Sequence, residues 1–149
     1  MSQRHIFEEE CFLAGCPAVN PQAFYLVGPI ICALGSEAQK QRFLPPILSG
    51  THFWAQGFSE PNAGSDLASL KTRAIRDGDH YVVNGQKIWT SEAHYSDWIF
   101  MLVRTSSLGK PQAGISFLLA DLKSPGITIR PIVGIDGGHI LNEVFFDDV

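Results

Sequence analysis

The spacing of apolar positions divides this chain of 149 residues near residue 50. Before that point apolar residues recur every three or four positions, which is typical of amphipathic helices. After it, short apolar runs alternate with turn residues, which is typical of strands. The helical pattern covers residues 6–13, 21–34 and 37–44. The strand pattern covers residues 53–59, 72–76, 80–84, 86–90, 98–104, 115–121, 127–132 and 143–146.

Local signals set the ends of the predicted helices. Gly28 and Pro29 predict a kink in the second helix, because proline lacks the N–H group that the helical ladder needs. Ser36 is a good N-cap and Gln39 occupies the third helical position, so the two predict a capping box for the third helix. The two prolines at 45–46 predict that this helix ends there.

Two dipeptides predict tight turns in the β-rich part. Asn84 and Gly85 stand between two apolar runs and predict a two-residue hairpin, and Asp77 and Gly78 predict a second turn. Eight short strands in about a hundred residues are typical of a sandwich or barrel. The sequence therefore predicts an α+β fold. Residues 1–50 form the end of an N-terminal helical domain, and residues 51–149 form an antiparallel, barrel-like β-domain. Both ends look like cuts through a longer protein.

Composition and charge exclude several classes of function. Hydrophobic residues make up 45% of the chain and charged residues 17%, which is a globular composition. A net charge of -4 with scattered Lys and Arg argues against binding nucleic acid or a membrane surface. Three cysteines without C-x-x-C spacing and five separated histidines predict no disulfide scaffold and no metal site. No apolar signal segment is present, so we expect a cytoplasmic protein, or a mitochondrial matrix protein in a eukaryote.

The first candidate site is the segment 54–66, where a strand runs into a loop rich in glycine, proline and hydroxyl side chains. Such a loop can offer backbone N–H groups and Ser hydroxyls to a flat, acceptor-rich ring or to a phosphate. A plain surface turn explains the same residues.

The second candidate is Trp89, followed by the hydroxyls of Thr90 and Ser91. An indole beside two hydroxyls can stack on an aromatic cofactor and donate to one of its ring nitrogens. The alternative is a core tryptophan at the end of a strand.

The two segments occur together at a separation that resembles the acyl-CoA dehydrogenase family. The resemblance rests on the stretches 56–66 and 81–91, and it extends over residues 35–50, 114–129 and 142–149. It implies the end of an N-terminal helical domain and the middle β-domain of such an enzyme. The cofactor that it implies is FAD, whose isoalloxazine ring the middle domain of this family holds.

The resemblance also implies roles for single residues. The stretch from Gln56 to Ser65 would line the polar edge of the flavin, with Phe58 contributing backbone and Ser59 its hydroxyl. Trp89 would lie against the ring, Thr90 and Ser91 would lie along the edge that receives hydride, and Ser65 would also touch acyl-CoA. Gln56, Ser59 and Ser91 differ from the aromatic residue and the two threonines that are common in the family.

The resemblance places the catalytic base outside this chain, in a C-terminal helical domain. No catalytic residue is therefore predicted here; Glu60 and Asp66 are expected to hold their loop, and the fragment alone should lack turnover. The parent enzyme would oxidise acyl-CoA to trans-2-enoyl-CoA, pass electrons to an electron-transfer flavoprotein or another acceptor, and form a homo-oligomer at full length.

Two other functions stay open on the sequence. A non-catalytic β-module could bind acyl-CoA or a protein partner without redox chemistry. A small β-barrel with exposed aromatic residues could also bind oligonucleotides, although the acidic balance disfavours this.

Overall fold

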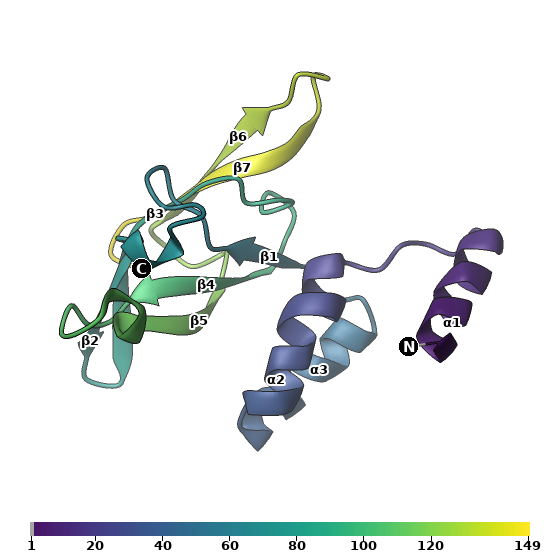
Figure 1. Cartoon of the computed structure of the whole chain (residues 1–149), viewed down its shortest axis with the longest axis horizontal. Coiled ribbons are helices and arrows are strands. Elements are labelled where there is room, and N and C mark those ends of the chain that lie inside the picture. The colour runs from purple at the N-terminus through teal and green to yellow at the C-terminus, as the bar shows by residue number, and fades with distance from the viewer. Residues whose placement is uncertain (1) are drawn as a thin grey trace.

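The computed structural model describes residues 2–149; Met1, the first residue of the predicted helical segment, lies outside the described residues. Helices form the first third of the chain and one seven-stranded mixed sheet the remainder (Figure 1). This arrangement confirms the predicted α+β fold class. The helices are α1 (Ser2–Leu13), the π-helix η1 (Gln22–Val27), α2 (Gly28–Leu34), α3 (Glu37–Leu48), and the 3-10 turns η2 (Leu67–Ser69) and η3 (Pro111–Gly114). The strands are β1 (Trp54–Gly57), β2 (Arg73–Asp77), β3 (His80–Lys87), β4 (Trp98–Arg104), β5 (Ile115–Asp121), β6 (Ile127–Val133) and β7 (His139–Phe146).

The capping box predicted for α3 is present. The Gln39 N–H donates to the Ser36 hydroxyl over 3.2 Å, and the Ser36 N–H donates to the Gln39 side chain over 2.8 Å. The predicted end of this helix at the prolines is wrong, because α3 continues to Leu48. Each proline removes one helical N–H donor, but burial of Ile47 and a bond from the Ser49 N–H to the Pro45 carbonyl stabilise the last turn.

The sheet has the strand order β1-β4-β2-β3-β7-β6, with β5 on the remaining edge of β4. Four pairings are antiparallel, as predicted: β2–β3, β3–β7, β4–β5 and β6–β7. The expectation of a purely antiparallel sheet is corrected at β4, which runs parallel to β1 and to one residue of β2. Parallel neighbours need a long crossover, and the chain between β1 and β4 supplies it.

The hairpin predicted at Asn84 and Gly85 is wrong, because β3 runs through both residues without turning. A Cβ on Gly85 would lie 2.6 Å from the Thr72 Cα, so the glycine is required by the close approach of another backbone. The turn predicted at Asp77 and Gly78 is confirmed, since Asp77 pairs with His80 across it and Gly78 has a φ of 59°.

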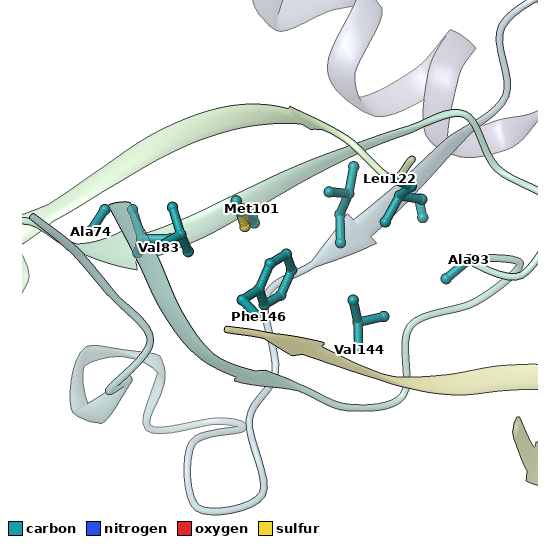
Figure 2. Packing of buried hydrophobic residues seen from close by; sticks show 10 residues of the cluster. Ala74, Val83, Ala93, Met101, Leu122, Val144 and Phe146 are labelled. Carbon is teal, nitrogen blue, oxygen red and sulfur yellow. The ribbon is translucent and has the colours of Figure 1, made fainter. Parts of the chain in front are cut away.

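Two hydrophobic clusters hold the fold together. The first lies inside the sheet, where residues of β1, β2, β3, β4 and β7 meet, so the sheet curls around it (Figure 2). The second joins the helices to β1 and β4. Its members are Ala23, Val27, Ile31, Phe43, Ile47, Trp54 and Phe100, all nearly inaccessible to solvent. The helices η1, α2 and α3 therefore pack on the sheet, whereas α1 lies apart from it (Figure 1). Among residues 2–149, no helix combines the length and apolar character needed to span a bilayer.

Candidate functional site

The two candidate segments lie side by side although they are far apart in sequence. The Ile88 N–H, directly before Trp89, donates to the Ser59 carbonyl over 3.0 Å. The loop after β1 and the end of β3 are therefore joined at the two positions that the sequence singled out. Phe58 and Ser59 on one segment, and Trp89 on the other, share this neighbourhood.

A buried ion pair between Lys87 and Glu60 links the two candidate segments. Lys87, the last residue of β3, is fully buried, and its Nζ donates to the Glu60 carboxylate over 2.8 Å and to the Phe58 carbonyl over 3.2 Å. The same carboxylate accepts the backbone N–H groups of Lys71 at 2.6 Å and Thr72 at 2.9 Å. Glu60 thus ties β3 and the chain before β2 to its own loop, which is the structural role predicted for it.

Burial and hydrogen bonding act in opposite directions on the pKa of Glu60. Burial alone would raise this pKa, but the bonds from Lys87 and from two backbone N–H groups outweigh it and hold the pKa below its ordinary value. Burial lowers the pKa of Lys87, and the partnership with Glu60 opposes that shift only in part. Glu60 is therefore a fixed carboxylate and a poor candidate for a base that exchanges protons with a ligand.

Asp66 holds its loop through its backbone. Its carbonyl accepts the Ser69 hydroxyl over 2.8 Å and the Ser69 N–H over 3.2 Å, while its carboxylate caps no helix. On the other side, the Arg104 guanidinium reaches the carbonyl of Ala68 over 2.6 Å and fixes the loop to β4.

Trp89 lies in a bend directly after β3, where the backbone hydrogen bonds to β7 have the register shift of a β-bulge. Lys87 pairs with Val144, whereas the Thr90 N–H bonds to the Asn142 carbonyl over 3.0 Å, so Ile88 and Trp89 together oppose the single residue Glu143. The register before the bulge is therefore shifted by one residue from the register after it. A bulge of this kind bends the strand and re-aims the side chain at the extra residue.

The backbone at the bulge is strained. Trp89 has a φ of 59°, a region that bulky residues rarely occupy, and Glu92 follows with a φ of 63°. The indole is 56% exposed, so it contributes little to the core. The alternative of a core tryptophan at a strand end is therefore wrong. Strain of this kind is typical of residues that a fold holds for function.

Thr90 and Ser91 continue the strained segment in different environments. Thr90 is fully buried, and its hydroxyl has no hydrogen-bond partner among residues 2–149, while Ser91 is half-buried. A buried hydroxyl without a partner costs about 1–3 kcal/mol. Ala93, two residues further on, packs in the sheet core and anchors the segment (Figure 2).

The remaining predicted residues lie along the first segment. Gln56 is half-buried in β1, and the half-buried Phe58 ring meets Phe100 edge-on with centroids 5.8 Å apart. Ser65 is exposed in the loop beyond the tight turn from Glu60 to Ala63. The structure thus brings Phe58 and Ser59 to the bulge, with Gln56 and Ser65 before and after them on the same segment.

Three cavities formed by the described residues lie away from Trp89, although the smallest of them is lined by residues of both stretches 56–66 and 81–91. The largest, about 760 Å³, opens between the helices and the β4–β5 edge and is mainly apolar. A second of about 280 Å³ lies between the loop before η1 and the end of α3, and a third of about 200 Å³ lies behind Glu60. Trp89, Thr90 and Ser91 line none of these three cavities. The indole is instead exposed on the surface.

The chemistry of this surface fits a flat aromatic cofactor. Trp89 supplies an exposed ring for stacking. The Thr90 hydroxyl has no hydrogen-bond partner among residues 2–149, but it is fully buried beneath this surface. Sequence reasoning missed Lys87 and Asn142, both fully buried in the region. The available signal was strand alternation, since Lys87 shares its face of β3 with Val83, and Asn142 shares its face of β7 with Val144.

Comparison with known proteins identifies the family. Residues 55–149 match the family model described as acyl-CoA dehydrogenase, middle domain. Acyl-CoA dehydrogenase IpdE1 of Mycobacterium tuberculosis is 51% identical over 148 residues, an alignment that covers 99% of this chain and 38% of that relative.

Solved structures agree with the sequence comparison. The Tcur3481-Tcur3483 steroid ACAD matches with a TM-score of 0.86 at 39% identity, over 91% of this chain and 35% of that one. A glutaryl-CoA dehydrogenase from Mycobacterium smegmatis in complex with FADH2 matches with a TM-score of 0.70 at 30% identity, over 80% of this chain and 30% of that one.

This chain belongs to the acyl-CoA dehydrogenase family, and its β-rich part is a middle domain of that family. It spans between about a third and two fifths of the length of these relatives.

Proposed function

We propose that this chain is the FAD-binding wall of an acyl-CoA dehydrogenase, with Trp89 against the isoalloxazine and hydroxyls from both segments along its polar edge. When bound, FAD accepts the hydride that leaves the β-carbon of an acyl-CoA. The chain's own residues would orient the ring and stabilise charge that develops on it. Gln56, Phe58, Ser59, Ser65, Trp89, Thr90 and Ser91 are the proposed contacts, and Ser65 would also meet acyl-CoA.

One observation carries this proposal: the hydrogen bond from Ile88 to Ser59 joins the two segments at the bulge that exposes Trp89. A plain surface turn at residues 59–65 does not require a buried ion pair beneath it. Maintaining a tryptophan at positive φ costs about 1–3 kcal/mol, which a purely structural strand end would avoid. A ligand that stacks on the indole would explain why the fold maintains this strained conformation.

The activity of the full-length protein is proposed from the family. The parent enzyme would convert acyl-CoA to trans-2-enoyl-CoA and pass electrons to an electron-transfer flavoprotein or another acceptor. The base that removes the α-proton would come from chain outside these residues, since Glu60 is held by Lys87 and by the backbone. The cytoplasmic location and the homo-oligomer stay predictions.

Flavin titration tests the proposal. FAD added to the 149-residue chain should lose fluorescence or shift its absorbance as it binds, and Trp89→Ala should weaken binding about tenfold through loss of stacking. Ser59→Ala should weaken it by a smaller factor, because one hydrogen bond contributes about 1 kcal/mol. Tyr81→Ala is the matched control, since Tyr81 is also an exposed aromatic residue of the β3 segment.

One result would overturn the flavin-binding proposal, and another would overturn only the placement of the base outside this chain. Equal FAD affinity for the wild-type chain, Trp89→Ala and Ser59→Ala would show that these side chains hold no flavin. Rapid bleaching of FAD by acyl-CoA on the isolated chain would show that a base lies within it. Binding of acyl-CoA without any FAD binding would favour the non-catalytic β-module.

A further inference from the structure

Asn142 makes more hydrogen bonds than any role in the sheet requires. It lies in β7, is fully buried, and its backbone carbonyl accepts the Thr90 N–H over 3.0 Å. Its side-chain Nδ2 donates back to the Thr90 carbonyl over 3.0 Å and also lies 3.2 Å from the Ile140 carbonyl. The Glu92 N–H bonds to the same Ile140 carbonyl over 2.7 Å. Asn142 therefore bonds both the N–H and the carbonyl of Thr90, the residue directly after Trp89. We call these two hydrogen bonds the grip of Asn142 on Thr90.

Two histidines complete the contacts of this side chain. The Asn142 Nδ2 lies 3.2 Å from Nδ1 of His94, and the Asn142 Oδ1 lies 2.8 Å from Nε2 of His139. The two imidazole rings stack with centroids 4.0 Å apart. Both histidines are exposed at the surface, so protons reach them from solvent, while the amide they contact is fully buried.

The hydrogen bonds fix the protonation state of His94. Nδ2 of Asn142 must be the donor, because it faces the carbonyls of Thr90 and Ile140. The amide has two N–H hydrogens for three neighbouring acceptors, so Nδ1 of His94 at 3.2 Å shares a hydrogen at most, and it faces the NH2 group as the unprotonated nitrogen of the ring. Oδ1 of Asn142 can only accept, so Nε2 of His139 carries a hydrogen in either charge state of that ring. A proton on Nδ1 of His94 would set two donors against each other and place a cation on the stacked His139.

We propose that Asn142 is a positioning residue that holds Thr90 and the strained Trp89 in place, and that the stacked pair of His94 and His139 makes this hold depend on pH. At neutral pH the side-chain amide of Asn142 donates to the Thr90 carbonyl, and the backbone carbonyl of Asn142 accepts the Thr90 N–H. Protonation of His94 turns the amide away from its acceptors, loosens the segment after the bulge and lets Trp89 leave its positive-φ conformation. The proposal rests on the proposed function only where it calls this segment part of the flavin site.

The charged groups around His94 and His139 determine whether the grip of Asn142 on Thr90 is lost at low or at high pH. His139 comes from β7, and Glu92 and Tyr95 come from the turn that carries His94; Glu92 is itself bonded by Asn20 over 3.3 Å. Partial desolvation and the neighbouring His139 lower the pKa of His94 below its ordinary value of 6.5, and the charge of Glu92 opposes this only in part. The grip is thus complete above that value and is lost as the pH falls below it and through the folded pKa of His94.

Amide hydrogen exchange of the 149-residue chain tests the proposal without any ligand. Protection of the Thr90 and Glu92 amides, corrected for intrinsic exchange, should fall about tenfold between about pH 7.5 and about pH 5.5, the order of magnitude expected for the loss of one hydrogen bond. His94→Gln offers an acceptor that does not titrate, so it should keep the protection at both pH values. His80→Gln is the matched control, an exposed histidine in β3 with its own partner in β2, and should behave as wild type.

A second variant tests the grip itself. Asn142→Asp keeps the shape but loses the donor to Thr90, so Thr90 should exchange about tenfold faster even at about pH 7.5. If this variant does not fold, the comparison of amide protection between wild type and His94→Gln still tests the proposal. Equal protection of wild type at both pH values, or the same loss in His94→Gln as in wild type, overturns the proposal.

FAD affinity measured at the two pH values distinguishes a failure of the pH-dependent hold from a failure of flavin binding. FAD affinity of the wild-type chain should fall over the same pH range, and that of His94→Gln should stay level. If exchange follows the prediction while FAD fails to bind at any pH, the pH-dependent hold stands and the flavin-binding proposal falls. If FAD binds equally at both pH values while Thr90 loses protection, Asn142 does not position the flavin site.

Discussion

Lys87→Met removes the cation from the buried ion pair that fastens the two segments of the site. The side chain of Lys87 has no exposed area and that of Glu60 has 7%, so the substitution leaves the carboxylate buried with only the two N–H groups of Lys71 and Thr72. Breaking a buried pair at one partner costs about 3–5 kcal/mol. Methionine has nearly the same volume as lysine, so loss of packing contributes little to this cost.

Urea denaturation followed by circular dichroism measures the effect. With a slope of about 2 kcal/mol/M, typical of a small domain, the midpoint should fall by about 2 M. Lys123→Met is the matched control: its ion pair with Asp97 has the same 2.8 Å distance, but Lys123 is 75% exposed. Exposed pairs contribute about 0–1 kcal/mol, so this midpoint should change little.

The double variant Glu60→Gln, Lys87→Met distinguishes the cost of an unpaired buried charge from any other effect of replacing Lys87. It removes both charges while a side-chain oxygen still accepts from Thr72, so its stability should lie well above that of Lys87→Met.

The carboxylate of Glu60 also predicts that the stability of the chain depends on pH. Its lowered pKa contributes stability that is present above the ordinary value of 4.5 and lost as the pH falls through the folded value, a loss that the double variant should lack. A Lys87→Met midpoint no lower than that of Lys123→Met would refute this reasoning.

Three further predictions concern the backbone and can be checked by the same denaturation assay. Trp89→Gly should be more stable than Trp89→Ala by about 1 kcal/mol, because glycine adopts the φ of 59° without strain; equal stabilities would mean that the bulge relaxes. Gly85→Ala should destabilise the chain by several times the roughly 1 kcal/mol expected for Gly78→Ala, since only the former drives a Cβ into Thr72. Ser36→Ala should cost about 1 kcal/mol through loss of the capping box, and no cost would mean that α3 frays at this end.

Apolar periodicity and cap residues predicted most of the fold, because they depend on contacts within one element. The strands 98–104 and 115–121 agree with β4 and β5 at both ends, and the capping box of α3 formed as predicted. The errors came where distant chain segments override local preference. The dipeptide at 84–85 is a strong hairpin signal, but its glycine is needed for the approach of Thr72.

The candidate site was predictable only in its exposed members. Hydroxyls and an aromatic residue in loops are visible as chemistry, so Ser59 and Trp89 stood out in the sequence. Lys87 and Asn142 were passed over because a charged or amide residue in a strand is ordinarily solvent-facing. Their position in the inward register is the sign that each has a buried partner, and those partners lie in other segments that only the fold brings together.

The positions of these two residues explain how the chain maintains a strained tryptophan. Lys87 lies two residues before Trp89 and is fixed to Glu60 and Phe58, while Thr90 lies one residue after it and is fixed to Asn142 on two sides. A positive φ at a bulky residue costs about 1–2 kcal/mol. Releasing that strain requires breaking a buried bond on at least one side, and such a break costs at least as much as the relief. The bulge is therefore held from both ends, and the exposed indole has a fixed backbone without needing contacts of its own.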